Sequence, residues 1–161
     1  MRKAFVVTSA LVLLAVIAQF YFAAVSAFTL PHEHNALHAT NGLIVIPAIA
    51  LINTIAASLA RAGGRTIGLA ALPFLLVILQ VVIIVASLLL LPGVETIGEG
   101  FGAEVVQQGG PAVYAVGLHA VNGLIILWVT VVTLRRARAH NAATDHNAAP
   151  ERAVVSASEW P

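Results

Sequence analysis

Four long apolar stretches, separated by short polar segments, organise the first 138 residues of the chain. They cover residues 4–28, 37–60, 67–91 and 113–134, and none of them contains Asp, Glu, Lys or Arg. Each exceeds the roughly 20 residues that a helix needs to cross a bilayer, and a helix satisfies its own backbone hydrogen bonds there. We therefore expect an all-α fold, a four-helix transmembrane bundle in residues 1–138 with the lipid bilayer as its surroundings.

Composition supports a membrane protein and narrows its chemistry. The chain has 161 residues, of which 60% are apolar and 9% charged, against roughly 45–50% and about 25% in soluble domains. A formal charge of +1 gives no reason to expect nucleic-acid binding. Because there is no cysteine, disulfides and thiolate metal sites are excluded. Residues 139–161 are Ala-rich and polar without helical periodicity, so we expect a disordered tail there.

The placement of the cations predicts the orientation of the spans. Arg2 and Lys3 precede the first span, Arg61 and Arg65 lie between the second and third, and three arginines follow the fourth, whereas the other two loops contain no Lys or Arg. This asymmetry predicts a multi-pass protein of the cell membrane with both termini in the cytoplasm. The first span also resembles an export signal, but its apolar run is longer than usual, so we expect it to be retained.

An internal repeat links the second and fourth spans. Residues 37–44 (LHATNGLI) match residues 118–125 (LHAVNGLI) at seven of eight positions, and both copies begin their span from the outer side. Gln19 and Gln80 also correspond in type within the first and third spans. The chain is therefore predicted to contain two helical hairpins in parallel repeat.

The repeated motif carries the candidate chemistry. In each copy a histidine, an asparagine three residues later and a glycine four residues later share one helix face. The candidate cofactor-binding residues are His38, Asn41, Gly42, His119, Asn122 and Gly123. Two such faces in one bundle would place two imidazoles near each other, and bis-histidine ligation of haem b suits that arrangement. One hypothesis is therefore electron transfer through haem b ligated by His38 and His119, with a redox partner in the membrane.

A second hypothesis is that the same faces are structural. Polar side chains inside a membrane face the bundle interior and hydrogen-bond across helices, while glycine permits close packing. The chain would then be a non-enzymatic membrane protein that binds a partner or forms a homo-oligomer; a quinone site is a further alternative. Depth counts against haem, because His38 lies 23 residues before Arg61 whereas His119 lies 16 before Arg135, a difference of about 10 Å along helices.

Other candidate sites are weaker. His32, Glu33 and His34 precede His38 in a pattern that suits an external zinc or copper site. Gln19 and Gln80 are interpreted as interhelical hydrogen-bonding residues, because no carboxylate accompanies them for a proton relay. Since no set of nucleophile, base and acid is recognisable, no catalytic residue is predicted.

The four short spans and the paired His-x-x-Asn-Gly motif resemble a family of small actinobacterial membrane proteins of unknown function. The resemblance covers about residues 3–138 and rests mainly on residues 118–125, with the region of Gln80 as support. It implies the architecture and no reaction. More distantly, the histidines look like those of one half of haem A synthase or of four-helix haem-b cytochromes, which implies His38 and His119 as axial ligands. The chain lacks the glutamate–histidine arrangement of haem A synthase, so that activity is not implied.

Overall fold

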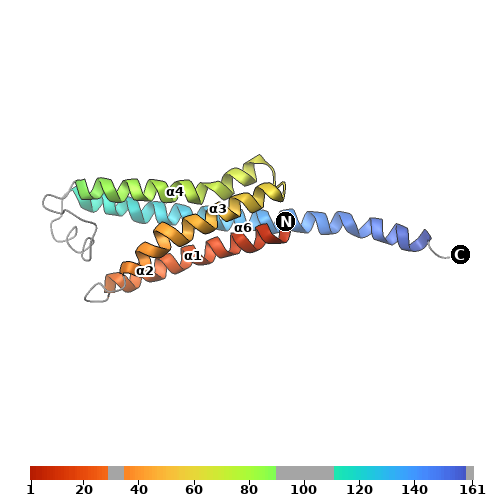
Figure 1. Cartoon of the computed structure of the whole chain (residues 1–161), viewed down its shortest axis with the longest axis horizontal. Coiled ribbons are helices and arrows are strands. Elements are labelled where there is room, and N and C mark those ends of the chain that lie inside the picture. The colour runs from red at the N-terminus through yellow and green to blue at the C-terminus, as the bar shows by residue number, and fades with distance from the viewer. Residues whose placement is uncertain (29–34, 90–110, 159–161) are drawn as a thin grey trace.

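The structure, a computed structural model, describes residues 1–28, 35–89 and 111–158, with most side chains described as far as residue 143. Within these ranges all the regular structure is helical: α1 (Arg2–Phe28), α2 (Asn35–Thr40), the π-helix η1 (Asn41–Val45), α3 (Ile46–Leu59), α4 (Gly64–Leu89) and α6 (Pro111–Ser158). Because α2, η1 and α3 follow one another without a break, the chain forms four long rods (Figure 1). The predicted all-α, four-helix fold is confirmed.

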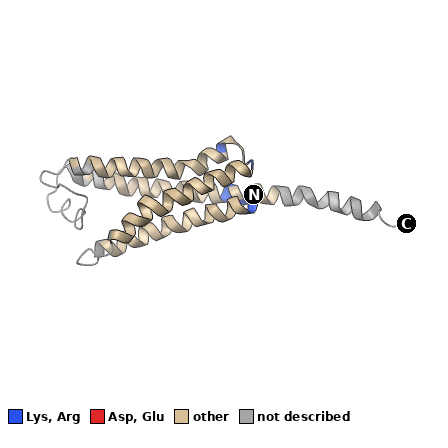
Figure 2. Ribbon diagram, in the orientation of Figure 1, with Lys and Arg blue, Asp and Glu red and all other residues tan. Residues whose placement is uncertain are grey.

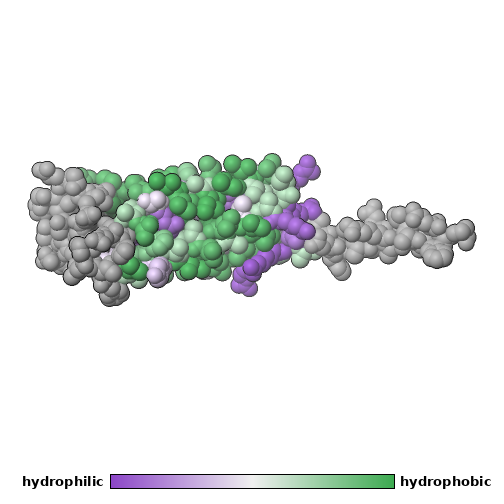
Figure 3. All heavy atoms as spheres, turned by 60° about the horizontal axis from the view of Figure 1, so that its bottom comes forward, coloured by the Kyte–Doolittle hydropathy of each residue, from purple (hydrophilic) through white to green (hydrophobic). Residues whose placement is uncertain are grey.

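The flank of the bundle is suited to lipid. Four helical segments are long and apolar enough to cross a membrane: Arg2–Ser26, Ala36–Leu59, Gly64–Ala86 and Gly117–Ala143. Large apolar side chains stand outward along them, with Leu14, Ile44 and Trp128 each more than 60% exposed. Figure 3 shows this apolar surface as a broad band that ends at a hydrophilic rim. An apolar flank of this extent identifies a multi-pass membrane protein.

Small side chains bring the helices together. In the order α1, α3, α4, α6, each rod packs against its two neighbours and the ring closes from α6 to α1. Near the chain's N-terminus the core consists of Phe5 surrounded by alanines, and farther along α1 it contains Val12 and Val16. Alanine allows helix backbones to approach closely. Because lipid is as apolar as the side chains, this close van der Waals packing drives helix association in a membrane.

The second rod has an irregular turn at its outer end. Pro47 stands in the first turn of α3 and has no N–H to donate, and the five residues before α3 form the wider turn of η1. The Ile46 N–H accordingly donates to the Asn41 carbonyl, five residues back. A π-turn inside an α-helix often marks a functional site, and this one holds Asn41 and Gly42 of the repeated motif. A proline inside an apolar span is expected to kink its helix, and at Pro47 the irregularity takes the form of this π-turn.

The last helix extends beyond the bundle. α6 continues as helix to Ser158 and projects past the other helices (Figure 1). Alanine has the highest helix propensity, so an Ala-rich segment can continue a helix that is already nucleated. His140 is half-buried, with its Nε2 atom 3.0 Å from the Ala60 carbonyl oxygen.

Candidate functional site

The first copy of the motif is joined to α1 by a closed set of hydrogen bonds. The Asn41 side-chain amide donates to the Gln19 Oε1 atom at 2.8 Å and to the Ala15 carbonyl at 2.9 Å. The Gln19 amide nitrogen lies 3.0 Å from the His38 carbonyl oxygen and 3.2 Å from the His38 Nε2 atom. Both protons of each side-chain amide therefore have a partner.

The second copy has most of these contacts between α4 and α6. Asn122 donates to the Leu76 carbonyl at 2.9 Å and to the Gln80 Oε1 atom, and the Gln80 amide nitrogen contacts His119 Nδ1. Leu76 stands four residues before Gln80, just as Ala15 stands four before Gln19. The predicted role of the two glutamines as interhelical hydrogen-bonding residues is confirmed. We call the group Gln19–His38–Asn41 the first triad and the group Gln80–His119–Asn122 the second triad.

The direction of these hydrogen bonds is decided by the backbone. A carbonyl can only accept, so the nitrogen of Asn41 must face Ala15, and the same nitrogen then faces the oxygen of Gln19. The Gln19 nitrogen is thereby turned towards His38. The same reasoning through Leu76 turns the nitrogen of Gln80 towards His119. Each imidazole therefore accepts a hydrogen bond from a glutamine.

Accepting at one ring nitrogen places the proton of a neutral imidazole on the other. For His38 the accepting atom is Nε2, so Nδ1 carries the proton, and for His119 the protonated atom is Nε2. Within the described part of the chain, the His38 Nδ1 atom is buried and has no hydrogen-bond partner. The first triad therefore leaves one buried N–H donor facing away from its glutamine.

The two triads meet through their histidines. The ring centroids of His38 and His119 are 6.1 Å apart, with 50° between the ring planes, and both side chains are half-buried. The depth difference of about 10 Å expected from straight helices does not separate them, because α2 and α3 cross the bundle at a slant (Figure 1). The structure thus brings together the histidines of the α2–α3 rod and of α6, which stand at opposite corners of the ring of helices.

The two glycines of the motif differ in what they pack against. A Cβ atom on Gly42 would lie 2.7 Å from the Gln19 amide nitrogen, whereas one on Gly123 would lie 3.5 Å from the ring of Phe20. The first distance is shorter than any van der Waals contact and the second is an ordinary one. Close approach, expected at both glycines, is therefore essential only at Gly42.

The hydrogen bonds of the triads do not have the arrangement that is usual around metal-binding histidines. A histidine that binds a metal usually donates its other N–H to an oxygen, whereas here a glutamine N–H faces each ring. Among the described residues, no group of three or more His, Cys, Asp or Glu side chains is placed to hold a metal ion. The predicted external site at His32 and His34 lies outside the described residues.

A further polar cluster lies deeper in the bundle and was not recognised in the sequence. Asn53, only 2% exposed, accepts hydrogen bonds at its Oδ1 atom from Thr8 at 2.8 Å and Ser9 at 2.9 Å. An asparagine in the middle of an apolar helix was the available signal, since such a residue needs an internal partner. The cluster joins α1 to α3 and has no recognisable reactive group.

Comparison with known proteins gives a family without an assigned activity. No curated protein and no solved structure matches the chain, so neither haem A synthase nor a haem-b cytochrome is found as a relative. The matched part contains the whole first triad and Gln80, but not residues 118–125, on which the resemblance mainly rested. As predicted from the sequence, the chain is similar to a family of unknown function (DUF6220), and the match covers residues 19–87.

Proposed function

We propose that this chain is a non-enzymatic membrane protein in which each triad stabilises one of two helical hairpins and the paired imidazoles are held for a partner. One observation carries the proposal: backbone carbonyls orient both asparagines, and through them both glutamines, so that each histidine is held as a hydrogen-bond acceptor. In hydrocarbon such bonds have no competition from water, and each contributes about 0.6 kcal/mol on average and up to ~2 kcal/mol.

The parallel repeat is part of this proposal. Equivalent contacts, including the carbonyl four residues before each glutamine, support two hairpins of common design. The first hairpin consists of α1 with the α2–α3 rod, and the second of α4 with α6. Each triad stabilises one hairpin, and the histidines join the two.

Haem b ligated by His38 and His119 is the competing proposal. The 6.1 Å between the ring centroids leaves room for one metal atom between two ring nitrogens, each about 2.0 Å from it. Ligation would, however, require each ring to carry its proton on the side of its glutamine, where it would meet an amide N–H. The buried His38 N–H instead favours a ligand that accepts a hydrogen bond, such as the carbonyl of a quinone.

A spectrum of the purified protein tests these proposals. Expressed in haem-replete cells and purified in mild detergent, the protein is expected to show no Soret band, and His38→Ala and His119→Ala to lower its melting temperature. His140→Ala, outside the triads, serves as the control for the absorbance spectrum. A Soret band lost in both triad variants and kept in the control would overturn the proposal in favour of haem. A quinone extracted from the parent and absent from His38→Ala would identify the partner.

We also propose that both termini are cytoplasmic. Figure 2 shows that the described Lys and Arg side chains gather at the end of the bundle where α1 begins and α3 meets α4, which supports the orientation given by the positive-inside rule. Cysteines introduced at Glu99 and Ala143 are expected to react with an impermeant thiol reagent from opposite sides of the membrane. Labelling of both from one side would contradict the orientation, and a mature N-terminus at Phe28 would show that the first span is removed.

A further inference from the structure

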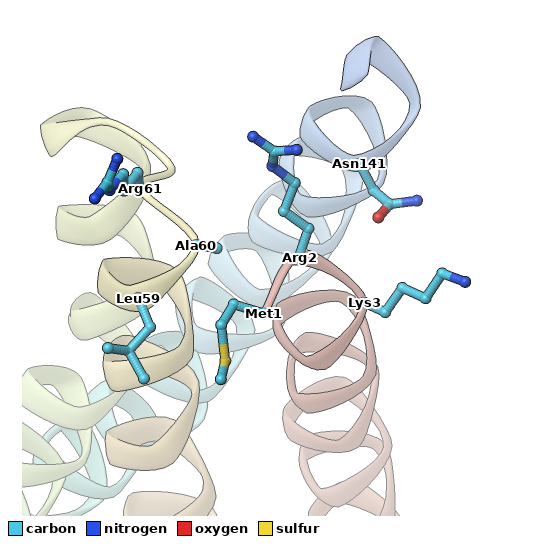
Figure 4. Close-up of a pocket in the computed structure, with 7 residues that line it drawn as sticks. All are labelled: Met1, Arg2, Lys3, Leu59, Ala60, Arg61 and Asn141. Atoms are coloured by element: carbon cyan, nitrogen blue, oxygen red, sulfur yellow. The ribbon is translucent and has the colours of Figure 1, made fainter. Parts of the chain in front are cut away.

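A basic hollow lies at the opposite end of the bundle from the triads. It has a volume of about 380 Å³ and is open to the outside, between the start of α1, the turn from α3 to α4, and α6 (Figure 4). Its lining residues are Met1, Arg2, Lys3, Leu59, Ala60, Arg61 and Asn141. Three helical segments that are distant in sequence therefore contribute to one concave surface at the rim of the apolar flank.

The charge of this hollow is entirely positive among the side chains that the structure describes. Arg2, Lys3 and Arg61 bring three cations to it. No Asp or Glu side chain belongs to the described set, and Figure 2 shows Lys and Arg but no acidic residue among the described residues at this end of the bundle. Arg2 and Lys3 extend to different sides of the start of α1, with Arg61 across the hollow from them (Figure 4).

Arg61 is held in a backbone conformation that side chains disfavour. Its φ angle is +55°, and it follows the last turn of α3, where its N–H donates to Ser58 and the N–H of Ala62 to Ala57. This position of a helix end is usually occupied by glycine, which has no Cβ atom to oppose a positive φ. An arginine at this position makes the fold less stable than a glycine would. The presence of the Arg61 side chain therefore needs a reason other than stability.

We propose that this hollow binds the phosphate of an anionic lipid head group. Guanidinium groups form paired hydrogen bonds with phosphate, and the free N–H groups at the start of α1 add favourable positive potential. The hydrophilic rim at the end of the bundle adjoins the apolar band (Figure 3), so the acyl chains of a lipid bound at this end can run down the flank. The site is separate from the triads and does not depend on their function.

Lipid-induced thermal stabilisation tests this site. Full-length protein in neutral detergent is titrated with phosphatidylglycerol, phosphatidylcholine or inorganic phosphate, and its melting temperature is measured. Phosphatidylglycerol is expected to raise the melting temperature, and the other two to have little effect. Equal stabilisation by phosphatidylcholine, or stabilisation by inorganic phosphate without any by phosphatidylglycerol, would overturn the proposal.

Variants separate binding from folding. Arg61→Gly relieves the positive φ, so without lipid its melting temperature should rise by about 2–4 °C, while its response to phosphatidylglycerol should fall at least tenfold in apparent affinity. Arg2→Gln should lose the response without that gain. Arg65→Gln is the matched control, because Arg65 is exposed in the first turn of α4 and does not line the hollow. Equal lipid responses in all three variants would contradict a specific site.

Discussion

Gln19→Leu is expected to destabilise the bundle by about 1–3 kcal/mol, more than the loss of a single average interhelical hydrogen bond in a membrane. Leucine is suited to the surrounding lipid, so the effect comes from the partners left behind. Asn41 loses one acceptor, and the His38 ring and its backbone carbonyl lose their donor. Unfolding in mixed detergent micelles, followed by far-UV circular dichroism, measures the loss.

The second triad and a double-mutant cycle make this prediction specific. Gln80→Leu should also destabilise the bundle, because Gln80 contacts the side chains of both His119 and Asn122. The pair Gln19→Leu and Asn41→Leu should cost less than the sum of the two single changes, since either change alone strands the other side chain. Ile17→Leu, at an exposed position of α1, is the neutral control. Strict additivity, or a Gln19 variant as stable as the control, would contradict a cooperative triad.

Gly42→Ala is expected to lower stability substantially, whereas Gly123→Ala should leave it unchanged or raise it by up to about 1 kcal/mol, because alanine has the better helix propensity. The new Cβ atom at residue 42 would stand 2.7 Å from the Gln19 amide nitrogen, so Gln19 must move and give up its hydrogen bonds to His38 and Asn41. At residue 123 the nearest atom is 3.5 Å away on Phe20. The cost at residue 42 should approach that of Gln19→Leu, after allowance for the better helix propensity of alanine.

In the comparison of the two alanine variants, Gly123→Ala is the control for Gly42→Ala. Both substitutions place the same methyl group at equivalent positions of the repeated motif, so they differ only in what lies opposite. Thermal unfolding of the two variants, measured side by side in one detergent, gives the difference directly. Equal stability losses would mean that Gln19 can reorient without cost, and the first triad would then contribute little.

The spans could be predicted because their cause is local in the chain. Each apolar stretch is long enough to cross a membrane by itself, and its lack of charged side chains is visible without any knowledge of its neighbours. The extent of α6 beyond the fourth span was less predictable, because polar, Ala-rich sequence is ambiguous between helix and coil, and a preceding helix can extend into it. The π-turn at Asn41 was missed, since only the kink, and not its form, follows from Pro47.

The repeat of a histidine, an asparagine and a glycine, and the two glutamines, were recognisable in the sequence because polar residues are rare in apolar spans and must face the interior. What connects them was decided by tertiary structure. The slant of the α2–α3 rod brings His38 to His119 despite their different distances from the arginines. The backbone carbonyls of Ala15 and Leu76 orient the asparagine amides, and through them the glutamines. They so determine which nitrogen of each imidazole accepts the hydrogen bond from the glutamine. No sequence pattern marks these two carbonyls, because every residue has one. The sequence by itself therefore determined which polar groups enter the membrane, and the packing of the helices decided which partner each group meets, because hydrogen-bond direction depends on atoms brought together from separate helices.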